Sequence, residues 1–146
     1  YGNKGYGTLS DIKESQILET PLAENLMAGL AMGLALEGFK PVLFFERHDF
    51  ILNASDNIVN HLDKIEKMSY GEFKTPVLIR ATIGSKIPLY PGPQHVQDFT
   101  QAFKNLLHMP VYKPLNAREI LNTYNHLKNF EKPAMIIEEK DLYNKV

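Results

Sequence analysis

The sequence contains no cysteine, which excludes disulfides, thiolate catalysis and zinc or iron–sulfur sites built on cysteine. It also has little excess charge: the formal net charge is -1, so no basic surface indicates nucleic-acid binding. The longest apolar run, residues 26–36, is too short to span a bilayer, and no apolar segment of a signal peptide opens the chain. We therefore expect a protein of the cytosol or an organelle matrix that binds neither nucleic acid nor membrane.

The 146 residues suit one domain with a substantial core, and a first residue other than Met indicates a trimmed or partial chain. Buried-strand patterns alternate with helical ones along this length. The expected strands are residues 16–19, 41–45, 76–82, 111–112 and 133–138. Alternation of this kind predicts an α/β fold of three αβα layers, with a mainly parallel sheet covered by helices on both faces.

The expected helices are residues 21–37, 54–68, 96–107 and 117–130. Gly38 can adopt the left-handed conformation that ends the first of these helices. Asn116 can cap the last one, with Glu119 at the capping-box position. We predict a flexible N-terminal segment over residues 1–15 and one domain over residues 16–146.

Glu24 is the residue that most needs an explanation. Thr20 can act as N-cap and Pro21 suits the first helical position, which puts Glu24 about one turn into the helix. The residues that follow are apolar on nearly every face, so we expect this helix to be buried. A buried carboxylate must be paired, protonated or in use. The alternative is a solvated charge that complements the helix dipole.

Ligands of parallel α/β sheets gather at the carboxyl ends of the strands, in the loops that lead into helices. In this chain that rule selects residues 19–24, 46–56 and 82–97. The last of these is a long Pro- and Gly-rich loop that ends near a histidine. We therefore expect Glu24, Phe50 and His95 to converge on one edge of the sheet.

The chain resembles the pyrimidine-binding domain of thiamine diphosphate-dependent enzymes of the transketolase type. Within that group it is most similar to the β subunit of 2-oxo acid dehydrogenase decarboxylating components. The resemblance rests on collinear segments that include Glu-Thr-Pro-Leu-Ala-Glu at the start of the first helix and a Gln-His pair. The matching segments are residues 19–24, 29–33, 38–42, 49–51, 56–60, 76–80, 94–95 and 133–138, together with Lys64.

The resemblance implies roles for particular residues. Glu24 would hydrogen-bond the N1′ nitrogen of the cofactor's aminopyrimidine and exchange a proton there, which activates the cofactor. Phe50 would lie against the aminopyrimidine ring, and Leu22 would also contact the cofactor. His95 would act near the substrate carboxylate or the cofactor-bound substrate.

The chain also departs from the family pattern. Arg47 and His48 are charged or ionisable where the family usually has aromatic or amide side chains. This departure indicates either contact with an anionic substrate or product, or a site that has drifted from the family's activity. Residues 85–90 replace a loop of small residues. The family's first strand and its C-terminal transketolase domain lie outside residues 1–146, and we find no Gly-Asp-Gly motif with its downstream Asn. We therefore expect half of a cofactor site, with Mg²⁺ and the diphosphate held by a partner domain or chain in a homo- or hetero-oligomer.

Each assignment has a plainer alternative. Phe50 can be a core residue, and His95 can be a hydrogen-bonded loop histidine. The segment 46–49 is more often a surface ion-pair network than a substrate clamp. Gly29 and Gly33 are best explained by close helix approach at a subunit interface.

The predicted function is cofactor activation for decarboxylation of a 2-oxo acid and acyl transfer. The alternatives are ketol transfer on sugar phosphates by a split transketolase-like enzyme, or a non-catalytic α/β subunit that serves assembly.

Overall fold

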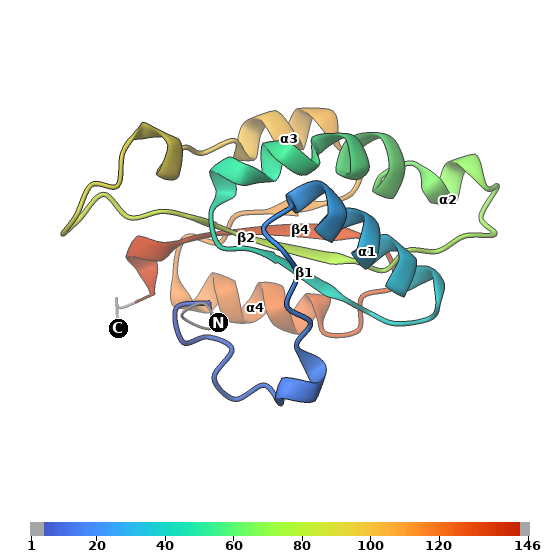
Figure 1. The fold of residues 1–146 in the computed structure, drawn as a ribbon, viewed down its shortest axis with the longest axis horizontal. Coiled ribbons are helices and arrows are strands. Elements are labelled where there is room, and N and C mark those ends of the chain that lie inside the picture. Colours follow the sequence, from blue (N-terminus) through green and yellow to red (C-terminus); the bar gives the residue numbers. More distant parts are fainter. Residues whose placement is uncertain (1–4, 144–146) are drawn as a thin grey trace.

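The computed structural model describes residues 5–143. Their sheet is four-stranded and entirely parallel, in the order β1-β2-β4-β3 (Figure 1). The strands are β1 Val42–Phe45, β2 Leu78–Ile83, β3 Val111–Tyr112 and β4 Ala134–Glu139. The predicted parallel sheet is confirmed.

Helices cover both faces of the sheet: α4 lies below it in Figure 1, and the other long helices lie above it. The α-helices are α1 Glu24–Leu36, α2 Ile65–Met68, α3 Thr100–Leu106 and α4 Ala117–Leu127. The three-layer αβα architecture is therefore also confirmed. Within residues 5–143, no helix combines the length and the apolar character that crossing a membrane requires.

Tighter or wider helical turns fill several of the connections. The short helices are η1 Glu14–Gln16, η2 His48–Ala54, η3 Asn57–Leu62, η4 Pro93–His95 and η5 Lys140–Leu142. η3 is a π-helix and the others are 3₁₀-helices. π-Helical turns are rare and occur often at functional sites.

The two central strands form the core because layers cover them on both sides. Every residue of β2 is buried, and so are all but the last of β4. Alternate side chains point to opposite faces, so Ile79 and Ile137 join the cluster under α1 and α3, whereas Leu78 and Ile136 pack with Leu127 of α4. This alternation divides the core into two parts.

Two of the predicted helix ends are confirmed. Gly38 has a φ of 90° and follows the C-cap of α1. Asn116 caps α4, because its Oδ1 accepts a hydrogen bond from the Glu119 N–H at 2.9 Å. The predicted start of the first helix is wrong, since α1 begins at Glu24 with Ala23 as its N-cap, and Thr20 does not cap it.

Two predicted elements differ from the structure. Residues 16–19 form no strand, because the 3₁₀-helix η1 ends at Gln16 and nearby side chains such as Leu18 are exposed. The continuous helix predicted over residues 54–68 is divided between the end of η2, the π-helix η3 and α2. Asp63 lies at the break, where its carboxylate accepts hydrogen bonds from the backbone N–H groups of His108 and Met109 at 2.8 and 2.7 Å.

The first described residues of the N-terminal segment pack against the sheet, whereas residues 10–16 are exposed. The flexibility expected of residues 1–15 stays a prediction. The Tyr6 hydroxyl donates to the Glu46 carbonyl oxygen at 3.1 Å. A Cβ at Gly5, whose φ is 60°, would lie 2.7 Å from Cε1 of Phe44, so only glycine allows this approach. Residues 1–4 of the predicted segment lie outside the described residues.

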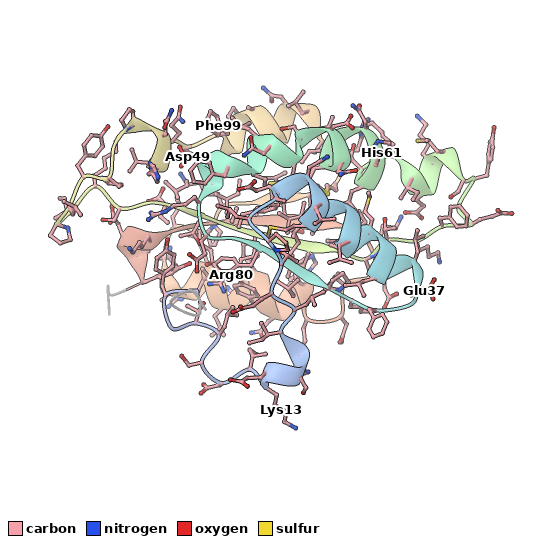
Figure 2. All side chains as sticks on the ribbon, in the orientation of Figure 1. Lys13, Glu37, Asp49, His61, Arg80 and Phe99 are labelled. Atoms are coloured by element: carbon pink, nitrogen blue, oxygen red, sulfur yellow. The ribbon has the colours of Figure 1, made fainter. Side chains whose placement is uncertain are left out.

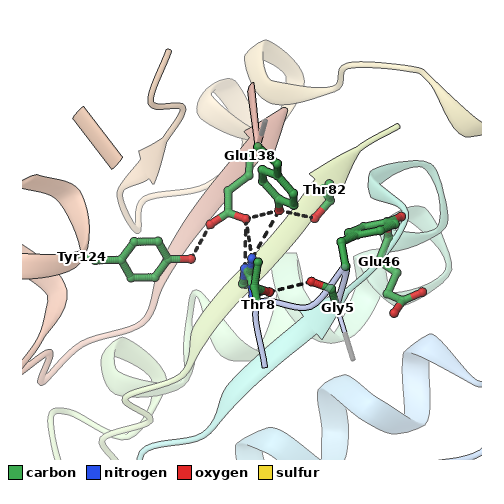
Figure 3. Close-up of polar contacts among 9 residues, drawn as sticks. Gly5, Thr8, Glu46, Thr82, Tyr124 and Glu138 are labelled. Atoms are coloured by element: carbon green, nitrogen blue, oxygen red, sulfur yellow. Dashed lines mark hydrogen bonds and ion pairs between the residues drawn. The ribbon is translucent and has the colours of Figure 1, made fainter. Parts of the chain in front are cut away.

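A buried ion pair joins β2 to β4 on the face that α4 covers (Figure 3). Nε and Nη2 of Arg80 donate to Oε2 of Glu138 at 3.0 and 2.8 Å, and these two residues are only 7% and 2% exposed. Tyr124 of α4 and Tyr143 near η5 donate their hydroxyls to the same carboxylate. Arg80 also donates to Oγ1 of Thr8 at 2.8 Å.

This network supports both ends of the described chain. Burial, together with the hydrogen bond to Glu138, raises the pKa of Tyr143 to about 12, so its hydroxyl remains a donor at neutral pH. Because Thr8 and Tyr143 both reach the central pair, the chain segments before α1 and after β4 are tied to the middle of the sheet.

We predict that Glu138→Gln lowers the free energy of unfolding by about 3 kcal/mol, because the buried Arg80 guanidinium loses its counter-charge. Urea unfolding followed by circular dichroism measures the change. Glu131→Gln is the control, since Glu131 pairs with Lys40 on the surface and its loss should leave stability nearly unchanged. Equal effects of the two substitutions would contradict the structural role of the Arg80–Glu138 pair.

Candidate functional site

The segment η2 supplies side chains both to the core and to the candidate site. A 3₁₀-helix has about three residues per turn, so residues three apart lie above one another. His48, Ile51 and Ala54 form one such row, and all are fully buried. Phe50 and Asn53 form the neighbouring row, which faces the start of α1 and the loop after β2.

Glu24 is the first residue of α1 and is half-buried. Its Oε2 accepts a hydrogen bond from Nδ2 of Asn53 at 3.3 Å. The next residue is held in a similar way, because Nδ2 of Asn57 donates to the carbonyl oxygen and Oδ1 of Asn25 at 2.8 and 2.7 Å. Amide side chains from η2 and η3 therefore fix the first residues of α1, where no side chain caps the helix.

The prediction that α1 is buried on all sides is wrong. Its alanine face packs against the domain, with Ala28, Ala31 and Ala35 in the core, because small side chains let the helix lie close to its neighbours. Its other face is apolar but exposed: Leu26 is 54% exposed and Leu30 is 37% exposed. Leu22, just before α1, is 93% exposed and contacts little of its own chain.

The structure brings His95 against Phe50. The two ring centroids lie 5.4 Å apart with an interplanar angle of 87°, an edge-on arrangement that aromatic pairs favour. Since Phe50 shares a row of η2 with Asn53, and Asn53 bonds Glu24, the predicted residues Glu24, Phe50 and His95 all lie at the carboxyl ends of β1 and β2.

The backbone of the loop after β2 comes very close to itself at Gly84. A Cβ at Gly84 would lie 2.0 Å from the carbonyl oxygen of His95 and 3.1 Å from Nη1 of Arg47. Only glycine fits this position, so Gly84 fixes where the loop returns. Arg47 is half-buried beside it and forms no ion pair with other residues in the range 5–143.

A hollow of about 270 Å³ opens beside this loop at the carboxyl ends of β2 and β4. Gly84 and Val96, which lie on either side of His95 along the loop, belong to its lining, and so do Lys86 and Lys140. Glu24, Phe50 and His95 are not among the residues that line this hollow, so it lies beside the candidate site and not within it. Among residues 5–143, no three histidine, aspartate or glutamate side chains cluster as metal ligands would.

His48, which the sequence suggested as a possible substrate contact, lies in the core. Its ring is fully buried, with the Phe99 and Phe103 rings each 5.8 Å away between centroids. Burial lowers the pKa of His48 to about 4, despite the opposing charges of Asp98 and Asp49, so the ring is neutral at pH 7. His48 and Asp49 therefore lie in the interior and not in a surface ion-pair network, and the buried His48 ring has no role in substrate binding in the proposal below.

Buried polar atoms that lack a hydrogen-bond partner concentrate in this corner of the molecule. Among the described residues they are both ring nitrogens of His48, Oδ2 of Asp49 and Nδ1 of His95. Such atoms are rare in folded proteins, and each calls for an explanation such as a bound water, an ion or a functional role. The other oxygen of Asp49, a residue labelled in Figure 2, accepts two hydrogen bonds from Gln97. No local sequence pattern predicts this contact.

The model of the family described as the transketolase pyrimidine-binding domain matches residues 4–145. The chain belongs to this family. The site described above therefore lies in a domain type that is named for binding the pyrimidine part of thiamine diphosphate.

Relatives of this pyrimidine-binding domain include subunits of larger enzymes. The β subunit of the pyruvate dehydrogenase E1 component from Rickettsia conorii is 28% identical over 137 residues, or 94% of this chain and 41% of that protein. The mitochondrial β subunit from Saccharomyces cerevisiae is 30% identical over 94% of this chain and 37% of its own length. The chain thus spans about two-fifths of the relatives that it matches.

The fold of the domain also has a solved counterpart. The structure of a split-gene transketolase, described as an inactive β4 tetramer, matches with a TM-score of 0.73 at 18% identity. The match covers 96% of this chain and 42% of that one. It shows that the two chains share a fold.

We predict that the free energy of unfolding decreases as the pH is lowered, because the neutral His48 ring is buried. The folded pKa of about 4 lies below the usual 6.5, so the unfolded chain takes up the proton first as the pH falls. The stabilisation is complete above pH 6.5 and is lost progressively toward pH 4, by about 3 kcal/mol in all. Urea unfolding at several pH values should show a smaller loss in His48→Phe, and an identical pH slope would contradict the assignment.

Proposed function

We propose that this domain binds the aminopyrimidine of thiamine diphosphate and activates the cofactor for decarboxylation of a 2-oxo acid and acyl transfer. The observation that carries the proposal is the placement of Glu24 beside η2, which also holds Phe50 against His95. Through η2, a carboxylate is thus linked to an aromatic ring and a histidine at the sheet edge where ligands of α/β domains bind.

The side chains present suit a flat nitrogen heterocycle. Oε2 of Glu24 is engaged by Asn53, whereas Oε1 has no hydrogen-bond partner among residues 5–143 and can meet a ring nitrogen. Phe50 is half-buried and offers apolar ring surface, which a heterocycle can stack on with a gain of about 1 kcal/mol. Leu22, which is highly exposed, can cover the cofactor once a partner chain closes the site.

The chain's own residues then have distinct tasks. Glu24 exchanges a proton with the pyrimidine N1′ nitrogen, and Asn53 holds the carboxylate in place for that exchange. His95 donates a hydrogen bond to the carboxylate of the substrate, and Arg47 beside it adds a positive charge. When bound, thiamine diphosphate would supply a nucleophilic carbon for the substrate carbonyl, and its ring would take up the electron pair that decarboxylation leaves behind.

A partner domain or chain completes the site in this proposal. The exposed face of α1 presents Leu26 and Leu30 next to Glu24, and an apolar face of this kind marks a surface that another protein covers. Nothing lies within 4 Å of a Cβ built at Gly33, so the backbone there is open to a neighbouring element. The partner holds Mg²⁺ and the diphosphate, in a homo- or hetero-oligomer.

The reaction class comes from the relatives. The two described above are named as pyruvate dehydrogenase β subunits, which favours a 2-oxo acid as the substrate. Ketol transfer on sugar phosphates by a split transketolase is the alternative, and a non-catalytic subunit for assembly is the other outcome that experiments must exclude.

We expect Glu24→Gln to lower turnover of the assembled enzyme about 100-fold or more, because glutamine cannot exchange the proton. Steady-state assays with the partner chain, thiamine diphosphate and Mg²⁺ measure the loss. Glu37→Gln is the matched control, since Glu37 is exposed at the opposite end of α1. Undiminished turnover of Glu24→Gln would exclude the catalytic role and leave the assembly subunit as the explanation.

The substrate class has a separate test. We predict turnover of 2-oxo acids such as pyruvate or branched-chain analogues, and none of ketose phosphates, by the same assembled enzyme. The release of carbon dioxide and the formation of new ketose are measured in parallel. Activity on sugar phosphates alone would replace the decarboxylase proposal with the transketolase-like one.

A further inference from the structure

Asp49 is a buried carboxylate to which the proposed function gives no task. It is 6% exposed, and its Oδ1 accepts hydrogen bonds from the backbone N–H of Gln97 at 3.1 Å and from Nε2 of Gln97 at 3.0 Å. Hydrogen bonds to an ionised acceptor are stronger than those between neutral groups. Asp49 therefore holds the loop between β2 and α3 at Gln97.

The residue after Asp49 holds the same loop at a second point. Phe50 contacts the ring of His95, which lies shortly before Gln97 in the sequence. Neighbouring residues of η2 thus bind neighbouring residues of the loop, Asp49 to Gln97 and Phe50 to His95. We call these two contacts the η2 clamp. Two contacts restrict the orientation of a loop segment more than either one alone.

A third contact limits the loop from the other side. The carbonyl oxygen of His95 lies against the backbone of Gly84, where a Cβ would come within 2.0 Å. The only regular structure between Gly84 and Val96 is the short 3₁₀-helix η4. Because this loop has little secondary structure of its own, the position of the His95 ring depends on the clamp and on Gly84.

We propose that Asp49 is a positioning residue, whose carboxylate acts through Gln97 to hold the His95 imidazole at the site. Asp49 itself touches neither cofactor nor substrate in this assignment. The expected effect of Asp49 on turnover depends on the proposed function of His95. The expected effect of Asp49 on the order of the loop does not depend on it. A displacement of about 1 Å in a reacting group can cost about 100-fold in rate, so a loosened loop affects catalysis before it affects folding.

The test compares Asp49→Ala, Asp49→Asn and Gln97→Ala in the assembled enzyme. Asp49→Ala removes the acceptor of both hydrogen bonds, so kcat should fall about tenfold or more while KM changes by less than about threefold. Asp49→Asn keeps Oδ1 and should restore most of kcat. Gln97→Ala loses only the side-chain contact and should lie between the two. Asp11→Ala, at an exposed position, is the control for removal of a carboxylate.

Hydrogen exchange measured by mass spectrometry supplies a readout that does not need activity. Peptides that span residues 93–99 should exchange faster in Asp49→Ala than in the unchanged protein, whereas peptides from β4 should not change. Unchanged exchange in this loop, or an Asp49→Asn variant as impaired as Asp49→Ala, would overturn the proposal. If the unchanged enzyme has no turnover, the proposed function fails and loop exchange alone decides whether the clamp exists.

Discussion

The short 3₁₀-helix η2 contributes residues both to the core and to the site. Residues three apart in η2 lie above one another, so one row faces the core and the neighbouring row faces the site. His48, Ile51 and Ala54 point into the core under α1 and α3. Phe50 and Asn53 point instead toward the loop after β2 and the start of α1. Phe50 and Asn53 are thereby anchored to the core, because each lies beside a residue of η2 that is fully buried. An irregular loop, without the three-residue repeat of η2, would not tie site residues to the core in this way.

The strands that end at the site are held together on their opposite face. Arg80 and Glu138 pair across β2 and β4 below the sheet, whereas Asp49 lies above it (Figure 2). Removing two charges from water is costly, and here the tyrosine hydroxyls of α4 and η5 supply further donors to Glu138. Consequently β2 and β4 remain aligned at the edge where the loop to His95 begins. The Arg80–Glu138 pair and the Asp49 carboxylate thus lie on opposite faces of one sheet.

Much of the fold followed from local patterns in the sequence. The apolar runs that became β1, β2 and β4 were predicted close to their observed bounds, since strands buried on both faces need continuous apolar residues. Gly38 and Asn116 marked helix ends by their own chemistry. The strand predicted at residues 16–19 and the single helix predicted at 54–68 failed, because neighbours along the chain do not report pairing partners or distant caps such as the contact from Asp63 to His108.

For the site, the sequence by itself determined which edge of the sheet carries Glu24, Phe50 and His95, because parallel strands bring their carboxyl ends together. Only the tertiary structure decided how these residues are held. The burial of His48 among Phe99 and Phe103, and the hydrogen bonds between Asp49 and Gln97, join segments far apart in the chain. The exposed leucine face of α1 was likewise not predictable from a helix that is apolar all round, because only packing shows that the alanines are the residues of α1 that become fully buried.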